Sequence, residues 1–248
     1  MHRKIFSHLQ SFAIGFLLTI GIWYVAYLII GRHVMPSPFT VFQALPLLLN
    51  HNILTHIYHS LFRIFAALLL SICIGLTTGL AMSHEQCAKI LTPFVYFTYP
   101  IPRVALLPVI LLVFGLRDLS KIIMITLIVV YPIIIVVRDS VKGIPKESYS
   151  TLICLGANKR QVFFSVTLPW AVSGILSTLR ISLGTAIAIL FFTEAYGTRY
   201  GMGFFVLEMW QRINYVMMFA GIVVLSLVGF LLFILIDILE GVLLRWQR

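Results

Sequence analysis

Arg180 and Glu194 are the residues whose positions most suggest chemistry, because each is a charge in or at the end of a long apolar run. An arginine at the centre of a bilayer costs about 2.5–3.5 kcal/mol, so Arg180 should face protein or water. It could bind an anion such as a sulfonate, nitrate or carboxylate, or it could be held by backbone carbonyls or a neighbouring helix. Glu194 could pair with Arg199 or shape an outer gate. Arg63 and Arg103 lie nearer the ends of their runs, where long side chains reach the interface.

The sequence carries none of the common catalytic motifs. It has no HExxH, no GxSxG and no GxxxxGK[ST] phosphate-binding loop. His33, His51, His56 and His59 cluster loosely, but their spacing does not form a metal site. We therefore expect no catalytic residue, no metal and no cofactor in this chain, so that any ATP and Mg²⁺ would be bound by a partner.

The composition is that of a polytopic membrane protein. The 248 residues are 60% hydrophobic and only 10% charged, with a mean hydropathy of +1.04, whereas soluble domains carry about 25% charged residues. A bilayer span needs about 20 apolar residues. We expect one all-α transmembrane domain over 1–248, with an uncleaved first span and six spans at about 11–30, 59–82, 92–114, 119–138, 169–193 and 215–240.

Positive charges predict the orientation of these spans. The net charge of +10 comes from Lys and Arg scattered between apolar runs rather than gathered on one face, which disfavours a nucleic-acid partner. With the N-terminus inside, ten Lys and Arg lie in inner segments and five in outer segments. Cytoplasmic loops collect such residues, so we expect both termini in the cytoplasm. Asp237 and Glu240 should then meet cytoplasmic lysines or the interface.

Prolines should interrupt the third span. The stretch TYPIPRVALLP at 98–108 cannot form an undisturbed helix, because an interior proline removes a backbone hydrogen bond and clashes with the preceding turn. In lipid, the freed carbonyls must be satisfied by protein or water. The break is either a packing kink or a discontinuity that lines a pathway.

The polar segment 139–168 contains the start and stop signals of two short helices. Pro145 suits a first turn, and Gly156 can adopt the left-handed conformation that ends a helix. Asn158 can cap a second helix, with Gln161 three residues later. Pro169 then marks entry to the fifth span.

Two roles for the first of these helices follow from its residues. Its apolar side chains, including Tyr149, Leu152 and Leu155, would form an exposed patch, and such patches mark partner sites. Alternatively the segment lies on the headgroups, held by anionic lipid at its lysines and arginine. The residues alone leave both interpretations open.

A family resemblance favours the partner site. Gly156 is followed thirteen residues later by Pro169 in GANKRQVFFSVTLP, and this spacing resembles the cytoplasmic loop of ABC importer permeases, the binding-protein-dependent inner-membrane components. Further elements in matching order resemble the nitrate/sulfonate/taurine branch: Pro36-Ser37-Pro38, His56-x-x-x-Ser60-Leu61-x-Arg63, PIPRVALLPVILLVFGLRDLSKI at 100–122, LRISLG at 179–184, and Glu194 followed by Gly201-x-Gly203. The family usually has Glu-Ala-Ala where this chain has Ser150, Thr151 and Leu152, and Glu147 lies one turn earlier.

The resemblance implies partners and a mechanism. It implies a bacterial inner-membrane permease, working as a homodimer with two ATPase subunits and an extracellular or periplasmic binding protein that contacts 31–58 and 194–214. ATPase docking would involve Glu147, Tyr149, Ser150, Thr151, Leu152, Leu155, Gly156, Ala157 and Asn158. The translocation path would include Pro100, Pro102, Arg103, Arg180 and Glu194. The substrate would be a small anion or a vitamin precursor.

A second class of function is a stand-alone ion-coupled carrier or a membrane-embedded enzyme. A carrier usually needs acids inside the membrane for its coupling ion, and the interiors of the predicted spans contain almost none. An enzyme would need a constellation of catalytic residues that the sequence does not contain.

Overall fold

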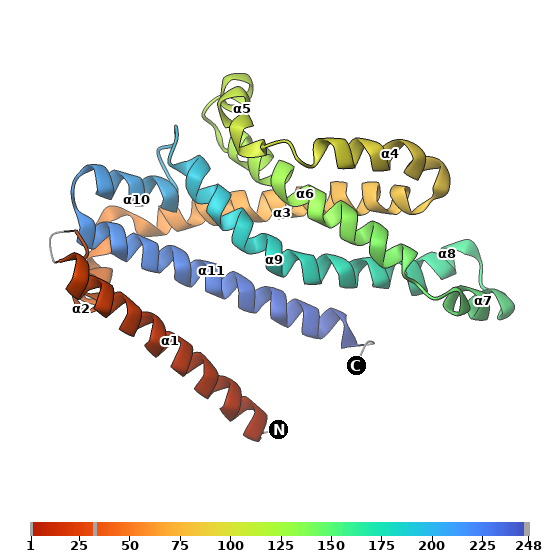
Figure 1. Ribbon diagram of the computed structural model, residues 1–248, viewed down its shortest axis with the longest axis horizontal. Coiled ribbons are helices and arrows are strands. Elements are labelled where there is room, and N and C mark those ends of the chain that lie inside the picture. The colour runs from red at the N-terminus through yellow and green to blue at the C-terminus, as the bar shows by residue number, and fades with distance from the viewer. Residues whose placement is uncertain (1, 32–33, 246–248) are drawn as a thin grey trace.

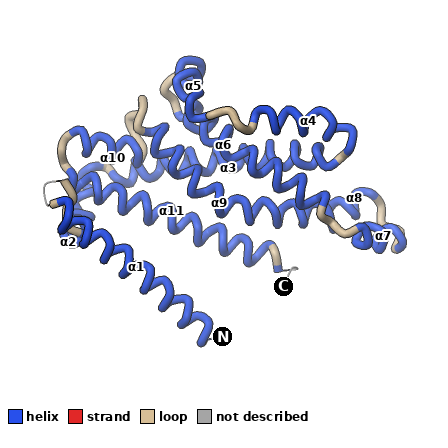
Figure 2. The backbone as a smooth tube through the Cα atoms, in the orientation of Figure 1, coloured by secondary structure: helices blue, strands red, loops and turns tan. Residues whose placement is uncertain are grey.

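The computed structural model describes the backbone of residues 2–31 and 34–245, and their side chains from residue 14 onward. All regular structure in this part of the chain is helical (Figure 2). The elements, in chain order, are α1 (His2–Ile30), α2 (Pro38–Ala44), the 3₁₀ helix η1 (Leu45–His51), α3 (Ile53–Ser83), α4 (Glu85–Thr98), the 3₁₀ helix η2 (Arg103–Leu106), α5 (Leu107–Phe114), α6 (Asp118–Lys142), α7 (Lys146–Cys154), α8 (Lys159–Val162), the π-helical turn η3 (Phe163–Thr167), α9 (Leu168–Glu194), α10 (Met202–Gln211) and α11 (Tyr215–Leu243).

Four helical stretches of the described chain are long and apolar enough to cross a membrane. They are α3, α6, the continuous stretch Lys159–Glu194 that contains α9, and α11. A fifth span forms if α4 and Arg103–Phe114 are taken together, bent by 82°. The apolar part of α1, Ile14–Ile30, is shorter than these. The polytopic all-α fold is thus confirmed, while the count of six spans stays a prediction.

The third predicted span is broken at its prolines, as expected. Pro100 and Pro102 lie in the connection between α4 and η2. The guanidinium group of Arg103 donates to the backbone oxygen of Tyr99 at 2.9 Å and lies 3.8 Å from the centre of the Tyr131 ring. The guanidinium group of Arg103 therefore satisfies a carbonyl at the broken end of α4, and its expected reach to the interface stays a prediction.

Close packing between α3 and α6 forms the centre of the bundle. A Cβ atom on Gly75 would lie 2.5 Å from Cγ2 of Ile133, and one on Gly79 would lie 2.6 Å from Cβ of Val137. Membrane helices associate through such close approaches, because lipid supplies little hydrophobic drive between them. α9 also packs against α6, contacts α3 and joins the same buried core.

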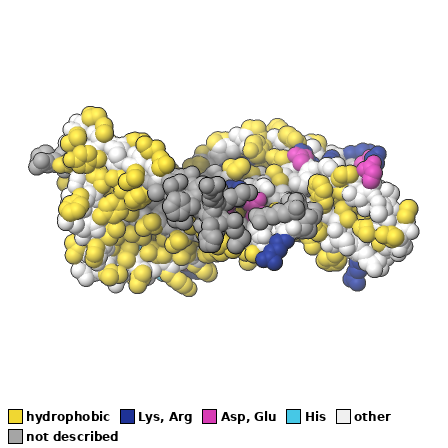
Figure 3. Space-filling model, turned by 90° about the horizontal axis from the view of Figure 1, so that it is seen from below, with side chains coloured by type: hydrophobic (Ala, Val, Ile, Leu, Met, Phe, Trp, Pro, Cys, Tyr) yellow, Lys and Arg dark blue, Asp and Glu magenta, His cyan; other side chains and the backbone are white. Residues whose placement is uncertain are grey.

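The bundle has two different ends (Figure 1). α7 and α8 form one end, and α2 and α10 form the other. The N-terminal end of α1 and the C-terminal end of α11 both lie away from the α2–α10 end. On the face seen in Figure 3, hydrophobic side chains cover much of the left part, and the few visible charged side chains lie toward the centre and right.

The helix α1 diverges from the other spans (Figure 1). Its described contacts centre on Trp23, whose ring stacks on Phe219 at 5.7 Å and whose Nε1 donates to the backbone oxygen of Pro36 at 3.2 Å. Most of its other described apolar side chains are exposed. Among the side chains described from residue 14 onward, the first predicted span is thus anchored mainly through Trp23.

Candidate functional site

A buried group of polar side chains fastens the end of the bundle near α10. Three of its members come from α3: His56, Ser60 and Arg63. Their spacing of four and three residues places them on one face of the helix. All three are buried, and Arg63 is only 3% exposed. A buried arginine needs opposite charges and hydrogen-bond acceptors around it.

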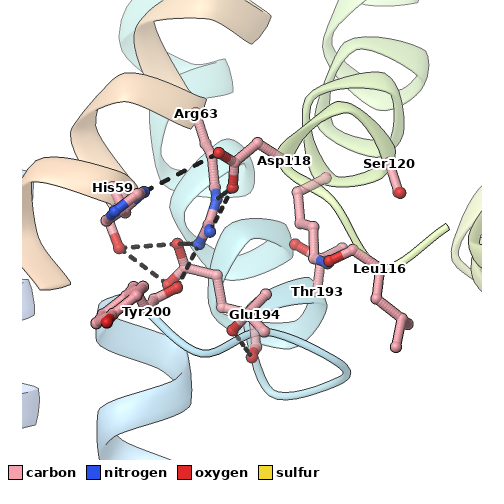
Figure 4. Close-up of polar contacts among 12 residues, drawn as sticks. His59, Arg63, Leu116, Asp118, Ser120, Thr193, Glu194 and Tyr200 are labelled. Carbon is pink, nitrogen blue, oxygen red and sulfur yellow. Dashed lines mark hydrogen bonds and ion pairs between the residues drawn. The ribbon is translucent and has the colours of Figure 1, made fainter. Parts of the chain in front are cut away.

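Two carboxylates and a backbone carbonyl surround the guanidinium group of Arg63 (Figure 4). Its Nη1 lies 2.6 Å from Oε1 of Glu194 and donates to the backbone oxygen of Tyr200 at 2.8 Å. Its Nη2 and Nε lie 2.6 and 2.8 Å from Oδ1 of Asp118. One side chain on α3 thus binds the first residue of α6, the last residue of α9 and the segment that follows α9.

Glu194 is the centre of this group and is fully buried. Besides Arg63, it accepts hydrogen bonds from Oγ of Ser60, at 2.8 and 2.9 Å to its two oxygens, and from the backbone N–H of Gly203 at 2.8 Å. Gly203 has to be a glycine, because a Cβ there would lie 2.5 Å from the backbone oxygen of Phe191. The carboxylate therefore draws the start of α10 against α9.

A buried lysine connects this polar cluster to the neighbouring loops. Nζ of Lys121 donates to the backbone oxygens of Leu116 at 2.9 Å and Gly197 at 3.3 Å, and the side chain is fully buried. His59 lies beside the cluster, with its ring stacked on Tyr200 at 5.2 Å. Lys121 thus joins the end of the broken span to the segment between α9 and α10.

This arrangement stabilises the fold rather than offering a reactive group. Among the described residues, no buried side-chain nitrogen or oxygen lacks a hydrogen-bond partner. The same residues contain no group of three His, Cys, Asp or Glu that could hold a metal ion. His33 lies outside the described residues. Of the other histidines considered as metal ligands, His56 belongs to the buried polar cluster around Glu194, and His59 lies at its edge.

The structure corrects the predicted partners of these charges. Glu194 pairs with Arg63 and not with Arg199, and Arg63 is buried rather than reaching to the interface. Asp118 and Lys121 were missed as members of the cluster. The His56–Ser60–Arg63 spacing was available as a signal, since these polar residues share one face at the start of an apolar helix.

Arg180 also has acidic partners that the sequence did not predict. Its Nη2 lies 2.6 Å from Oδ1 of Asp237 and 2.5 Å from Oε2 of Glu240, joining α9 to α11. The expectation that these two acids meet cytoplasmic lysines is wrong, while the alternative that they lie at the interface stays a prediction. All three side chains remain partly exposed. With all three side chains ionised, Arg180, Asp237 and Glu240 together carry a net charge of −1. Arg180 is therefore not an unpaired cation available to bind an anion.

The two predicted short helices are present at the other end of the bundle. After α7, Gly156 has φ +80°, and the backbone N–H groups of Gly156 and Ala157 donate to the oxygens of Ile153 at 2.9 Å and Leu152 at 3.0 Å. This pair of bonds is a Schellman motif, which needs a left-handed residue at the position of Gly156. The predicted helix end at this glycine is confirmed.

A capping box starts the next helix, as expected from the sequence. The side chain of Asn158 accepts from the backbone N–H of Gln161 at 2.9 Å, and the side chain of Gln161 accepts from the backbone N–H of Asn158 at 2.8 Å. The helix then continues through the π-helical turn η3 into α9. α7 is therefore held at a defined angle to the span that follows it.

The surface of α7 is partly apolar and open. Ile153 is 61% exposed and Leu155 is 78% exposed. Ser150 and Thr151 donate their hydroxyl hydrogens to backbone oxygens one turn earlier, including that of Glu147 at 3.1 and 2.8 Å. The two hydroxyls that stand where the family usually has Glu-Ala are thus bonded within the helix.

Comparison with known proteins places this fold in a class. The geometry defines an all-helical membrane protein with a broken span and a capped helical excursion at one end. Residues 71–245 match the family model of the binding-protein-dependent transport system inner membrane component. The chain belongs to this family and is an ABC transporter permease of the inner membrane.

Individual relatives agree with this assignment. The chain is 30% identical to the formylaminopyrimidine transport permease protein ThiX of Halalkalibacterium halodurans, over 94% of each chain. It is 30% identical to the taurine transport system permease protein TauC of Escherichia coli, over 93% of this chain and 86% of the relative. It is 28% identical to the putative aliphatic sulfonates transport permease protein SsuC of Bacillus subtilis, over 89% and 80%.

A solved structure shares the fold. A chain of the MetNI methionine ABC transporter, in an inward facing conformation, matches with a TM-score of 0.61 at 18% identity. The match covers 76% of this chain and 94% of that chain. This likeness supports the fold, and the family itself implies an ATPase and a substrate-binding protein as partners.

Proposed function

We propose that α7 and the Gly156–Asn158 turn are the part of this permease that docks on its ATPase and couples ATP hydrolysis to import. The observation that carries the proposal is the capped, apolar and exposed α7, held rigidly to the start of α9 by the Schellman motif and the capping box. A short helix with these properties transmits a push from a partner into a span. ATP and Mg²⁺ are bound by that partner, and this chain carries no catalytic residue.

The docking surface combines apolar and polar positions. Leu155 offers apolar area at the tip, and the exposed Glu147 offers a carboxylate one turn before the position where relatives have theirs. The other proposed contacts are Tyr149, Ser150, Thr151, Leu152, Gly156, Ala157 and Asn158. Because the hydroxyl groups of Ser150 and Thr151 bond within α7, contact there depends mainly on shape and apolar area rather than on an acidic side chain.

One copy carries one docking helix, so a homodimer with two ATPase subunits completes the transporter. The excess of Lys and Arg in the inner segments supports an orientation with α7, α8 and both termini in the cytoplasm. The opposite end, with α2 and α10, then faces outward and receives the binding protein (Figure 1). The buried polar cluster around Glu194 stabilises the structure of that outward-facing end.

The proposed translocation path runs beside the broken span. Pro100 and Pro102 give the chain a non-helical stretch, which membranes tolerate where it lies against protein or water. Arg103 and Glu194 would support this path rather than bind solute, since their charged groups are engaged by the chain itself. The partly exposed Arg180 group, which carries two acids, makes a bare cationic anion site at that depth unfavourable.

The substrate is a small solute of the kind that the relatives' names describe: taurine, an aliphatic sulfonate or a formylaminopyrimidine. Arg63, Arg103 and Arg180 are each engaged by groups of this chain, so none of them offers an unpaired cation to an anionic substrate. We therefore assign selectivity mainly to the binding protein. An ion-coupled carrier is disfavoured, because Asp118, Glu194, Asp237 and Glu240 are all paired with an arginine.

Cross-linking tests the docking proposal directly. Cys154 is an exposed cysteine on α7, and replacing Cys73 and Cys87 with alanine leaves it as the single thiol. We expect disulfide cross-links from Cys154 to cysteines placed along the surface groove of the co-expressed ATPase. A matched control carries its single cysteine at Arg199, near α10. Cross-linking from position 199 but not from 154 would contradict the proposal.

A further inference from the structure

A cavity of about 490 Å³ lies where α7 and α8 meet the ends of α3 and α6. Its walls include Ser83 at the end of α3, Lys142 at the end of α6, Tyr149 on α7 and Lys159 at the start of α8. It is thus bounded by the docking segment on one side and by span ends on the other. Tyr149 and Ala157, two of the proposed docking contacts, line this cavity, whereas its lysines take no part in the docking surface.

The polar part of this cavity is cationic. Lys142, Lys159 and His84 line it, and no aspartate or glutamate does. In the described part of the chain, neither lysine makes an ion pair or a side-chain hydrogen bond. A neighbouring depression shares Ser83 and Lys142 with this cavity, and is also lined by Lys89 and Glu85. Two unpaired lysines at one cavity favour an anionic ligand.

The depth and the apolar wall of the cavity identify the source of that anion. α3 and α6 end at its rim, and the continuous stretch Lys159–Glu194 begins there, so the cavity lies at the ends of the spans, where lipid headgroups are expected. Leu80, Val141 and Phe163 form an apolar wall beside the lysines. Basic pockets between span ends bind lipid headgroups in this way. A soluble phosphate would use the lysines but not the apolar wall.

We propose that this cavity binds the phosphate-bearing headgroup of one anionic phospholipid, between Lys142 and Lys159, with the start of its acyl chains along the apolar wall. Such a lipid would contact α6, α7 and α8 at once. It would also lie beside the hydrogen bond of 3.3 Å between the Tyr149 and Thr167 hydroxyls, which links α7 to the π-helical turn before α9. The lipid is therefore placed to stiffen the docking segment against the spans.

Binding of lipid to the full-length chain tests the site without any assumption about transport. The purified chain in detergent is titrated with phosphatidylglycerol, and bound lipids are counted by native mass spectrometry. The pocket variant is Lys142→Gln/Lys159→Gln. The control is Lys146→Gln/Arg160→Gln, which removes two cations from the same segment that do not line the cavity. Thermal unfolding checks that both variants are folded, and we expect wild-type melting temperatures because all four side chains are exposed.

We expect one tightly retained phosphatidylglycerol per chain, bound about 30-fold more weakly by the pocket variant, as two lysines near a lipid surface predict. The control should weaken binding less than threefold. Equal losses in both variants would overturn the site, because they would show a diffuse attraction only. Equal retention of phosphatidylcholine would overturn the preference for anionic lipid.

Two further arms identify the source and the consequence of the ligand. Millimolar inorganic phosphate should not displace phosphatidylglycerol, and displacement would assign the cavity to a soluble anion instead. The effect on coupling rests on the proposed function, so it is measured separately, as ATPase stimulation in vesicles with and without phosphatidylglycerol. Lipid dependence in the control but not in the pocket variant is expected. Identical dependence in both, with lipid binding lost only in the pocket variant, would overturn the stiffening role and leave the binding site standing.

Discussion

Glu194→Gln should destabilise the permease strongly, although it changes only one side-chain oxygen to an amide group. Glu194 is fully buried, and its two oxygens receive hydrogen bonds from Arg63, Ser60 and Gly203. A glutamine offers one accepting oxygen and turns an N–H₂ donor toward the remaining donors. Arg63 keeps Asp118 but loses its closest carboxylate partner on α9.

The magnitude follows from the burial. Removing one partner of a buried ion pair costs about 3–5 kcal/mol. For a chain of this length, 3 kcal/mol corresponds to a fall in melting temperature of about 6–12 °C. The matched control is Glu208→Gln, which breaks the exposed pair with Arg212 on α10. An exposed helix pair contributes about 0.3–0.5 kcal/mol, so that variant should melt within about 2 °C of the wild type.

Thermal unfolding of the purified chain in one detergent, followed by circular dichroism, measures both variants. A double-mutant cycle with Arg63→Met isolates the pair, because the double variant no longer buries the Arg63 charge without its Glu194 partner. We expect the double variant to be more stable than the sum of the single effects predicts, by about 1–3 kcal/mol. Equal melting temperatures for Glu194→Gln and Glu208→Gln would refute the reasoning that the buried cluster fastens this end.

Three further predictions concern the docking turn, the helix packing and the exposed charge group. Gly156→Val should leave membrane insertion intact but uncouple ATP hydrolysis from transport, because a β-branched residue resists φ +80°; Gly156→Asn, which tolerates that conformation, should retain coupling, and normal transport by the valine variant would argue against the turn. Gly79→Ala should destabilise the chain by about 1–3 kcal/mol, since its Cβ would lie 2.6 Å from a side-chain carbon of α6. Gly184→Ala, whose Cβ would meet no atom of this chain within 4 Å, should be neutral or stabilising, and equal unfolding temperatures for the two would contradict the packing argument. Arg180→Gln should impair transport, and neutralising its two acidic partners in the same variant should restore part of it; an unrepaired loss would mean that the arginine itself binds substrate.

Local features of the fold were predictable because their physics acts within a few residues. Pro100 and Pro102 predict a break wherever the surrounding helix lies, and the structure places the break there. Gly156 and Asn158 likewise act on backbone groups that are two to four residues away. Hydropathy located the long spans for the same reason, since each span satisfies its own backbone.

The partners of the buried charges were not predictable, because they depend on helix packing. Glu194 lies five residues from Arg199 but pairs with Arg63, which is 131 residues away in the sequence. Arg180 finds its acids 57 and 60 residues later. Sequence proximity favoured the wrong partner in the first case and hid the partners in the second. The choice is made by which faces of α3, α6, α9 and α11 meet in the bundle.

ATP-driven uptake into proteoliposomes tests the central claim most directly. The chain is reconstituted with its ATPase, with the binding protein outside and ATP inside, and uptake of radiolabelled taurine, an aliphatic sulfonate and a formylaminopyrimidine is followed. Uptake of one of these solutes should require ATP, the ATPase and the binding protein together, and should be lost in the Gly156→Val variant. Undiminished uptake by the chain without the ATPase would contradict the account.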